Sequence, residues 1–557
     1  MKFSKLLLVG VAAIAMASCG KKDAGDAPKS ETSQQAAKAG AGSPLDSRFT
    51  LKDAEVVDID AFFALFPEKS RPTYETTSFD KGLGATVVRN LRFADADDGE
   101  SLTVARAEFF GLDLDAIDRV KNAETADPAA PFETLFQKVR LFDVATDGFA
   151  EGDENAKLKI GGVEFDQLAM RQGGTKEGGV GDDGARFFNA VNLAGIYFKD
   201  AEFTAEGPKS PSVIMQLPDF RLGGLGGGKL GAIIANDLEY TVSQSDASIE
   251  VMRAAMGPQG AMFFDGPLAG FIAPKHQRVQ LKGFEWRNLD FAGLLEWGLK
   301  DEEPPMTAEN LIDLGTMKAV GMDMFVNGKK ASTAAEMTMT SGKFTWLAPS
   351  NIRMDTKGAT YDFTAYLPET EADALGVLKT NGLDKVKADG FAEWIWNSKN
   401  GVADLNYAVN MDNVADFSTT FGLSNLKLAD LAAARAEGET NVVAGHGAFK
   451  KFSLKLKDEK ALDAIFGLAA LQMGGTGEDL RQSAPAMIRL SGAQVAQMNP
   501  RISAYINAVA DFVAKGGTLE IDAQPAAPVA FTTLQATSMS APQTLPDVIN
   551  LEVTHKE

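Results

Sequence analysis

The chain has 557 residues, 45% of them hydrophobic and 24% charged, and its 76 acidic against 55 basic side chains give a formal net charge of −21. Such a chain can bury a large core without disulfides, and its length suggests two to four structural units. The negative charge opposes binding to nucleic acid and to anionic lipid head groups, so we expect no nucleic-acid partner.

An apolar run from Leu6 to Met16 follows Lys2 and Lys5 at the start of the chain. At about 1.5 Å per residue, a helix of this length cannot cross a hydrocarbon core of about 30 Å. A basic start, a short apolar core and small residues before a cleavage point are typical of a secretory signal, which is removed. The sequence therefore predicts a signal peptide over residues 1–18.

The single cysteine of the chain, Cys19, stands directly after this segment. The residues from Met16 to Cys19 read Met-Ala-Ser-Cys and resemble the lipobox of bacterial lipoproteins. The resemblance implies thioether-linked diacylglycerol on Cys19 and a further acyl chain, such as palmitate, on its new amino group. Several acyl chains make membrane attachment durable, so membrane lipid is an expected partner.

An ordinary signal peptide with an incidental cysteine is the alternative. A cysteine in an oxidising compartment normally pairs in a disulfide, and this chain offers no second one, which favours lipidation. Gly20 replaces the Asp that retains many lipoproteins at the inner membrane. We therefore expect a lipid-anchored protein of the outer membrane, facing the periplasm. Without residues 1–18, 53 basic side chains face 76 acidic ones, a net charge of −23.

Residues 19–48 hold one bulky apolar residue, Leu45, among small and polar ones, which predicts a disordered tether behind the lipidated cysteine. A flexible coil of this length spans about 30 Å. The remaining chain is divided into an N-terminal β-rich region (49–220), a central β-hairpin region (221–440) and a C-terminal α+β unit (441–557).

The N-terminal region begins with a short helix predicted over residues 60–66. Strand-like runs at 86–93 and 102–109 are separated by Asp98-Gly99, a strong hairpin signal. Further Asp-Gly and Asn-Gly pairs predict more hairpins at Asp147, Asp183, Asp265, Asn327, Asn381, Asp389 and Asn400.

The clearest strand covers residues 404–412, where Leu405, Tyr407, Val409 and Met411 alternate with polar residues. This alternation predicts one apolar and one polar sheet face. Its expected hairpin partner is the Trp-Ile-Trp run at 394–396, and a similar alternation marks residues 451–457.

The C-terminal unit changes to helical periodicity. Apolar residues between Ile502 and Val513 share one helix face, with Pro500 in the first turn and Gly516 at the end. A second helix is predicted over 462–473, and short strands at 519–521 and 551–553. The predicted class is α+β, mainly antiparallel β: a hairpin-rich extended sheet or sandwich with a helical C-terminal unit.

Two stretches resemble cofactor or metal motifs, but the residues around them do not fit those motifs. Glycines between Gly223 and Gly231 match the spacing of nucleotide-binding loops, but Leu230 stands where Mg²⁺ coordination needs Ser or Thr. A flexible loop is the interpretation. The acidic residues at 95–100 are one position short of a calcium loop and predict an acidic hairpin tip, with weak Ca²⁺ binding left open.

The three histidines, His276, His446 and His555, form no metal-ligand spacing. His446, between two glycines, is the best catalytic candidate, but a solvated histidine at a strand end is the favoured interpretation. We therefore predict no catalytic, cofactor or metal residue and no cofactor, and Cys19 as the one functional site.

Across residues 80–430, repeated hairpins with apolar faces resemble the large AsmA-like periplasmic β-proteins, although those usually carry a membrane helix where this chain has the lipobox. The resemblance implies an elongated sheet with a groove for lipid. The first functional hypothesis is a non-enzymatic envelope lipoprotein that binds or supports lipid, another apolar ligand or outer-membrane components. The second is a scaffold that contacts envelope proteins, and the third an extracytoplasmic hydrolase.

Overall fold

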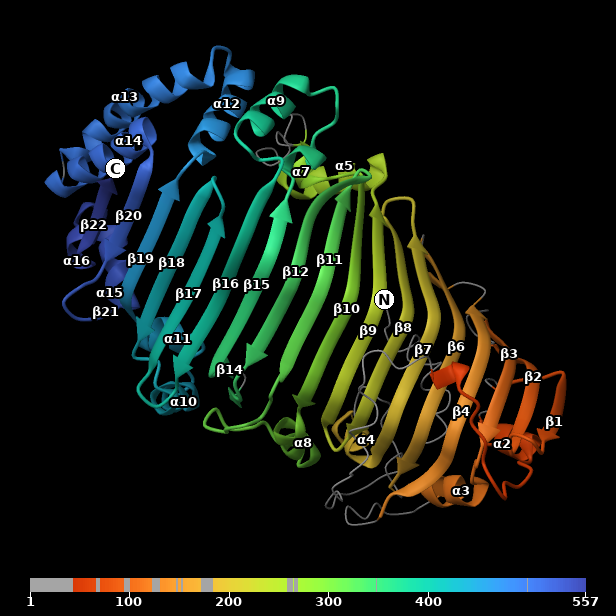
Figure 1. The fold of residues 1–557 in the computed structure, drawn as a ribbon. Coiled ribbons are helices and arrows are strands. Elements are labelled where there is room, and N and C mark those ends of the chain that lie inside the picture. The colour runs from red at the N-terminus through yellow and green to blue at the C-terminus, as the bar shows by residue number, and fades with distance from the viewer. Residues whose placement is uncertain are drawn as a thin grey trace. The chain divides into compact units, whose positions relative to one another are not determined.

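The computed structural model describes residues 44–66, 71–94, 101–122, 131–146, 149–151, 154–171, 184–257, 264, 269–346, 348–497 and 499–557. Strands, mainly antiparallel, make up 47% of the structure and helices 29%. The predicted class is confirmed, and within each unit the strands lie side by side in an open sheet instead of a sandwich (Figure 1).

The chain folds into two compact units that are discontinuous in sequence and are described separately. Unit 1 comprises Met1–Met252, Arg278–Glu303 and Leu311–Met317. Unit 2 comprises Arg253–Gln277, Pro304–Asn310 and Lys318–Glu557. The predicted divisions at 220/221 and 440/441 stay predictions.

The strands of unit 1 form an antiparallel meander in which each strand pairs with the next, except that β4 pairs with β6 and the short β5 pairs with β6 alone. Most of β10 belongs to this unit and pairs with β9. The strands are β1 (Thr76–Asp80), β2 (Ala85–Ala94), β3 (Ser101–Phe110), β4 (Glu133–Thr146), β5 (Phe149–Glu151), β6 (Glu154–Met170), β7 (Val191–Glu206), β8 (Ser212–Gly226), β9 (Lys229–Ser243) and β10 (His276–Asp290).

Unit 1 also has helices before, between and after these strands. They are η3 (Pro44–Asp46), α2 (Ile59–Ala64), α3 (Leu114–Asn122), α4 (Gly184–Ala190), most of α5 (Asp246–Ala255) and α8 (Ala292–Leu299). The predicted helix at 60–66 is thus α2, where the Asp58 side chain accepts a hydrogen bond from the Ala61 N–H at 3.0 Å. This cap satisfies one of the amides left free in the first helical turn.

The sheet of unit 2 runs antiparallel in the order β12, β15, β16, β17, β18, β19, β20, β22. Its strands are most of β11 (Thr316–Val326), β12 (Lys329–Ser341), β15 (Asn351–Tyr361), β16 (Val386–Asn397), β17 (Val402–Met411), β18 (Ala415–Ser424), β19 (Ala448–Asp458), β20 (Gly517–Ala523), β21 (Val529–Ala530) and β22 (Leu551–Lys556). A separate two-stranded ribbon joins β13 (Phe344–Thr345) to β14 (Ala348–Pro349).

Unit 2 also carries the C-terminal helices. Its helices are α7 (Ala269–Ile272), η6 (Phe363–Tyr366), α9 (Ala372–Thr380), α10 (Leu428–Ala436), α11 (Val442–His446), α12 (Ala461–Met473), α13 (Gly477–Ala496), α14 (Pro500–Lys515), α15 (Phe531–Ser540), η7 (Pro542–Thr544) and α16 (Leu545–Val548). In the part of the chain that the structure describes, no helix combines the length and apolarity needed to cross a bilayer.

Most predicted elements are confirmed. The runs at 86–93 and 102–109 are β2 and β3, which pair as a hairpin, and Asn327-Gly328 is the turn between β11 and β12. The run at 394–396 pairs with β17 as expected, with Trp394 opposite Leu405. The helix predicted to start at Pro500 is α14, which Asn499 caps and Gly516 ends.

Three predictions from glycine-rich signals are wrong. Residues 223–231 form the ends of β8 and β9 and their turn, because Gly227 and Gly228 both adopt the positive φ that a tight hairpin needs. Asn381-Gly382 follows the end of helix α9 instead of joining two strands. Asp389-Gly390 lies inside β16. The pairs at 98–99, 147–148 and 265–266 lie outside the described residues, as does the first residue of the pair at 183–184.

The last five residues of the predicted tether, 44–48, lie on the sheet of unit 1. Leu45 contacts Gly162 so closely that a Cβ at this glycine would stand 2.5 Å from the Leu45 Cδ1. Arg140 donates a hydrogen bond to the Ser47 carbonyl at 3.1 Å. The packed part of the chain therefore begins no later than Leu45, and Cys19 lies outside the described residues.

Candidate apolar binding face

The sheet of unit 2 has one apolar face. Residues directly opposite each other on antiparallel strands share a face, so the register places whole rows of side chains on it. One row from β15 to β22 consists of Ile352, Trp394, Leu405, Phe421, Phe452, Ala523 and Leu551. The next consists of Met354, Ala392, Tyr407, Thr419, Leu454, Ile521 and Val553. We call this surface the apolar face.

Much of the apolar face is accessible to solvent. Met354, Leu405 and Tyr407 are between 41% and 47% exposed, and Ile352, Trp394, Phe421 and Phe452 are half-buried. Scattered apolar residues on a surface are ordinary, but contiguous apolar patches mark sites for proteins, membranes or ligands. The face is therefore the strongest candidate for a binding surface in unit 2.

The opposite face of the same sheet is polar and rich in ion pairs. Arg353 lies 2.7 Å from Asp355 and 3.2 Å from Glu393, and Lys451 lies 3.1 Å from Asp404. The hydrogen bond from Arg353 lowers the pKa of the Asp355 carboxyl. These ion pairs make this side of the sheet more polar than the apolar face.

In unit 1, helices cover part of the apolar face of the sheet. Between β2 and β6 the helices α2 and α3 cover it, and Phe62 of α2 packs on Phe109 of β3 with ring centroids 5.6 Å apart. Val163, Phe165 and Leu168 of β6 are at most 1% exposed. This part of unit 1 is a closed hydrophobic core.

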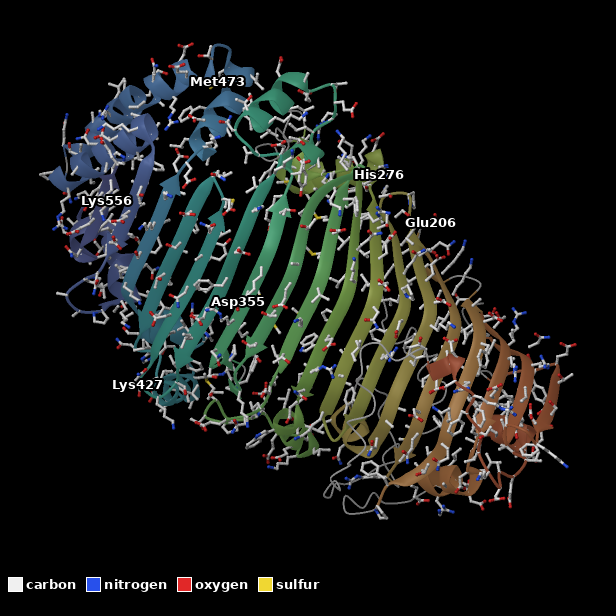
Figure 2. The ribbon with its side chains drawn as sticks, viewed as in Figure 1. Glu206, His276, Asp355, Lys427, Met473 and Lys556 are labelled. Carbon is white, nitrogen blue, oxygen red and sulfur yellow. The ribbon has the colours of Figure 1, made fainter. Side chains whose placement is uncertain are left out.

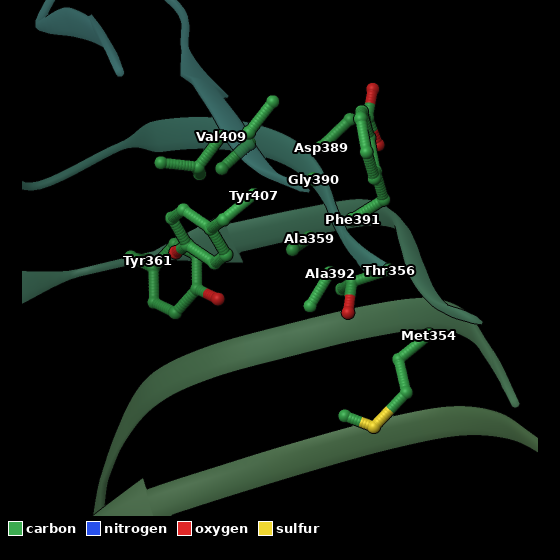
Figure 3. A pocket seen from close by; sticks show the side chains of 12 residues that line it. Met354, Thr356, Ala359, Tyr361, Asp389, Gly390, Phe391, Ala392, Tyr407 and Val409 are labelled. Carbon is green, nitrogen blue, oxygen red and sulfur yellow. The ribbon is translucent and has the colours of Figure 1, made fainter. Parts of the chain in front are cut away.

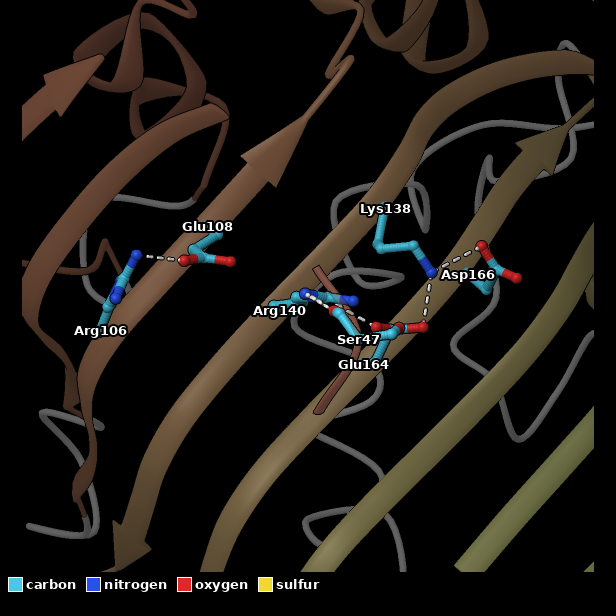
Figure 4. A network of polar contacts seen from close by, with 7 residues as sticks. All are labelled: Ser47, Arg106, Glu108, Lys138, Arg140, Glu164 and Asp166. Carbon is cyan, nitrogen blue, oxygen red and sulfur yellow. Dashed lines mark hydrogen bonds and ion pairs between the residues drawn. The ribbon is translucent and has the colours of Figure 1, made fainter. Parts of the chain in front are cut away.

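The polar face of unit 1 carries a buried ionic cluster. Glu164 accepts hydrogen bonds from Lys138 at 2.5 Å and from Arg140 at 2.7 Å, and Lys138 also reaches Asp166 at 3.1 Å (Figure 4). The Phe49 ring lies beside the cluster, with the Lys138 ammonium 5.0 Å from its centroid. Each of these charges is paired, as is typical of a buried ion cluster that supports the fold.

Glu108 is a further buried acid on the same face. It pairs with Arg106 (Figure 4). Burial nevertheless raises its pKa, and it outweighs the opposite influence of Arg106 and Arg140. Sequence reasoning missed all these charges, because alternating charged residues on a strand are typical of a solvated face.

The histidines that the sequence singled out lie apart from the apolar face or at its edge. His276 begins β10 and is exposed (Figure 2). His446 ends α11, exposed, with its Nε2 3.0 Å from the Glu439 carboxylate. His555 lies on β22, where its Nε2 is 2.7 Å from the Gly516 carbonyl oxygen.

Metal ligands do not gather in the described part of the chain, where no three His, Cys, Asp or Glu residues are placed to hold an ion. The acidic run at 95–100 lies outside it. The apolar face itself presents apolar side chains and a few hydroxyl groups, such as those of Tyr407 and Thr419.

Comparison with known proteins adds one match. A family model described as an uncharacterized protein matches residues 408–556. The matched segment begins within β17 and ends in β22, so it includes one end of the apolar face and the C-terminal helices. No curated protein matches the chain.

Proposed function

We propose that this protein is a non-enzymatic lipoprotein, anchored to the bacterial outer membrane through acylated Cys19, that binds lipid or another apolar ligand on the apolar face of unit 2. The observation that carries the proposal is the row of half-exposed apolar side chains across β15 to β19. Keeping apolar area in water costs about 25 cal/mol per Å², so a ligand that covers this area gains affinity from it.

The charge distribution favours hydrocarbon as the part of the ligand in contact. The chain has a net charge of −21, and its acidic surface repels anionic head groups. The apolar face presents rings and aliphatic side chains instead, which suit acyl chains. An amphiphile would therefore lie with its chains on the face and its head group toward water.

Lipid transfer from vesicles tests the proposal. The full chain with Cys19→Ser, which carries no acyl group, is mixed with phosphatidylethanolamine vesicles that contain a fluorescent phospholipid. We expect transfer of the fluorescent lipid to the protein, and recovered lipid by mass spectrometry. Leu405→Asp, which charges the apolar face, should reduce transfer about tenfold, because it buries a carboxylate under the chain.

Ser418→Asp is the matched control. Ser418 is an exposed residue of β18, the strand paired with β17, and it faces the polar side opposite Lys455. The substitution adds the same charge as Leu405→Asp but leaves the apolar face unchanged. Lipid transfer should therefore equal that of the parent protein, the full chain with Cys19→Ser alone. Equal losses in the two variants, or no transfer by the parent, would remove lipid binding on this face.

The anchor is tested in cells. With Cys19→Ser the protein should lose its acyl groups and be released from the membrane or left uncleaved, while the body stays folded. If the processed variant still fractionates with membranes after a high-salt wash, lipid on Cys19 is not the anchor.

A scaffold that contacts envelope proteins is the second candidate, and the C-terminal helices favour it. Met473 of α12, Leu490 of α13 and Met539 of α15 are between 72% and 80% exposed. Figure 2 labels Met473. Crosslinking in cells separates the two functions. A scaffold should give one reproducible protein partner, lost with Leu490→Gln, whereas a lipid binder should not depend on Leu490.

A further inference from the structure

A hollow of about 210 Å³ opens at β15, β16 and β17 of unit 2 (Figure 3). Small residues such as Gly390 and Ala392 line it on β16, between Met354 and Tyr361 of β15 and Tyr407 of β17. Most of its lining side chains belong to the apolar face. The hollow is therefore a depression in that face.

A bulge in β15 shapes the hollow. The register shifts between Thr356 and Ala359, so that two residues of β15 stand opposite Asp389. The Asp389 carboxylate fixes the bulge by accepting a hydrogen bond from the Gly358 N–H at 2.6 Å. Bulges re-aim side chains, and this one returns Tyr361 to the same face as Thr356.

Gly390 keeps the hollow open. A Cβ at this position would stand 2.8 Å from the Ala408 carbonyl oxygen, closer than real contacts allow. The strand therefore has no side chain here, opposite Thr356 and Val409. A glycine inside a strand commonly marks close approach of another group.

Three hydroxyl groups line this apolar hollow. The side-chain hydroxyl groups of Thr356, Tyr361 and Tyr407 make no hydrogen bond to any residue that the structure describes. The rings of the two tyrosines are held in place, Tyr361 by Phe363 at 6.0 Å and Tyr407 by Phe417 at 5.8 Å between centroids. By contrast, the hydroxyl of Tyr74 donates to Asp60 at 2.7 Å.

The lining favours an uncharged partner for these hydroxyls. It contains no Lys or Arg, and its one carboxylate, Asp389, is occupied by Gly358. The volume is below the 300–1,000 Å³ or so of pockets that enclose a whole small molecule. Only part of a ligand fits, and the rest must lie on the apolar rows to either side.

We propose that the hollow holds the uncharged polar junction of a chain-like amphiphile, such as the ester linkage at the head of an acyl chain. Thr356, Tyr361 and Tyr407 donate to the ester oxygens, while the acyl chain lies along the apolar face. The inference rests on the proposed function and adds to it the position and chemistry of a selective site.

Two fluorescent probes of equal chain length test it: a pyrene-labelled fatty-acid methyl ester and the corresponding pyrene-labelled alkane. Binding is measured on the full chain with Cys19→Ser. The double variant Tyr361→Phe and Tyr407→Phe keeps both rings and removes both hydroxyls. We expect it to weaken ester binding about tenfold, equal to about 1.4 kcal/mol, and to leave alkane binding within about twofold.

Two further variants complete the design. Tyr366→Phe is the control, because Tyr366 stacks on Phe271 in the same unit at 4.7 Å and does not line the hollow, so neither probe should change. Ala392→Leu fills the hollow and should weaken the ester more than the alkane. Circular dichroism verifies that each variant folds.

The outcomes separate the two proposals. If the parent binds both probes and the double variant weakens them equally or not at all, the hollow is not the ester site, whereas binding on the apolar face stands. Unchanged ester binding in Ala392→Leu overturns the site as well. If the parent binds neither probe, both the site and the proposed function fail.

Discussion

The apolar sides of the two units differ in what covers them. In unit 1, α2 and α3 close the face between β2 and β6, and Phe165 of β6 is fully buried. In unit 2, the same alternation of apolar and polar residues produces a face on which Leu405 and Tyr407 stay more than 40% exposed. Identical strand chemistry thus yields a core in one unit and a candidate binding surface in the other. The covering helices decide which one forms.

The largest expected effect comes from opening the closed core. Phe165→Ala should lower the free energy of unfolding by about 3–5 kcal/mol, because it removes a fully buried ring and leaves a cavity. Met354→Ala, on the apolar face, should lower it by about 1 kcal/mol. Urea unfolding followed by far-ultraviolet circular dichroism measures both, fitted with two transitions because the chain has two units. Similar losses would mean that Met354 is covered in solution.

The buried ionic cluster of unit 1 should be the next most sensitive feature. Glu164→Gln leaves Lys138 and Arg140 without their shared carboxylate, which should cost about 3 kcal/mol. Asp166→Asn is the matched control, since the side chain of Asp166 is 52% exposed and should cost under about 1 kcal/mol. Equal costs in urea unfolding would show that water reaches Glu164.

The local elements of the fold could be predicted because they follow from local pattern. Alternation from Leu405 to Met411 predicted β17, and its hairpin partner at Trp394 followed from the turn residues between them. The helical spacing after Pro500 predicted α14. These signals lie within a few residues of one another, so a single sequence contains them.

The hollow and the ionic cluster depend on distant residues and gave no such signal. Asp389-Gly390 was interpreted as a turn, whereas Gly390 is needed inside β16 because the Ala408 carbonyl leaves no room for a Cβ. Its neighbour Asp389 fixes the bulge of β15. The only clue in the sequence was a turn signal within an otherwise strand-like run. Such local conflicts are expected at functional sites.

A smaller effect is expected where the N-terminal segment covers the polar face of unit 1. Gly162→Ala places a methyl group against the end of the Leu45 side chain, which should cost about 1 kcal/mol. Adding Leu45→Ala should restore part of the loss by making room. A double-mutant cycle in urea unfolding measures this coupling. Strictly additive costs would show that Leu45 does not press on Gly162 in solution.

The smallest expected effect is a pH dependence from Glu108, on the same polar face. Burial raises the pKa of its carboxyl in the folded state, whereas in the unfolded chain a glutamate has a pKa of about 4.3. As pH rises through this value, Glu108 loses its proton in the unfolded chain but keeps it in the folded protein. The free energy of unfolding therefore falls as pH rises from the unfolded pKa to the folded pKa, and above the folded pKa this loss is complete. The wild type should therefore lose stability relative to Glu108→Gln over that interval and then run parallel to it. Urea unfolding of both proteins between pH 4 and pH 8 measures the difference. If the wild type instead becomes more stable relative to the variant as pH rises, Arg106 and Arg140 lower the pKa of Glu108 more than burial raises it. The polar face would then be less shielded from water than the core on the other side of the sheet.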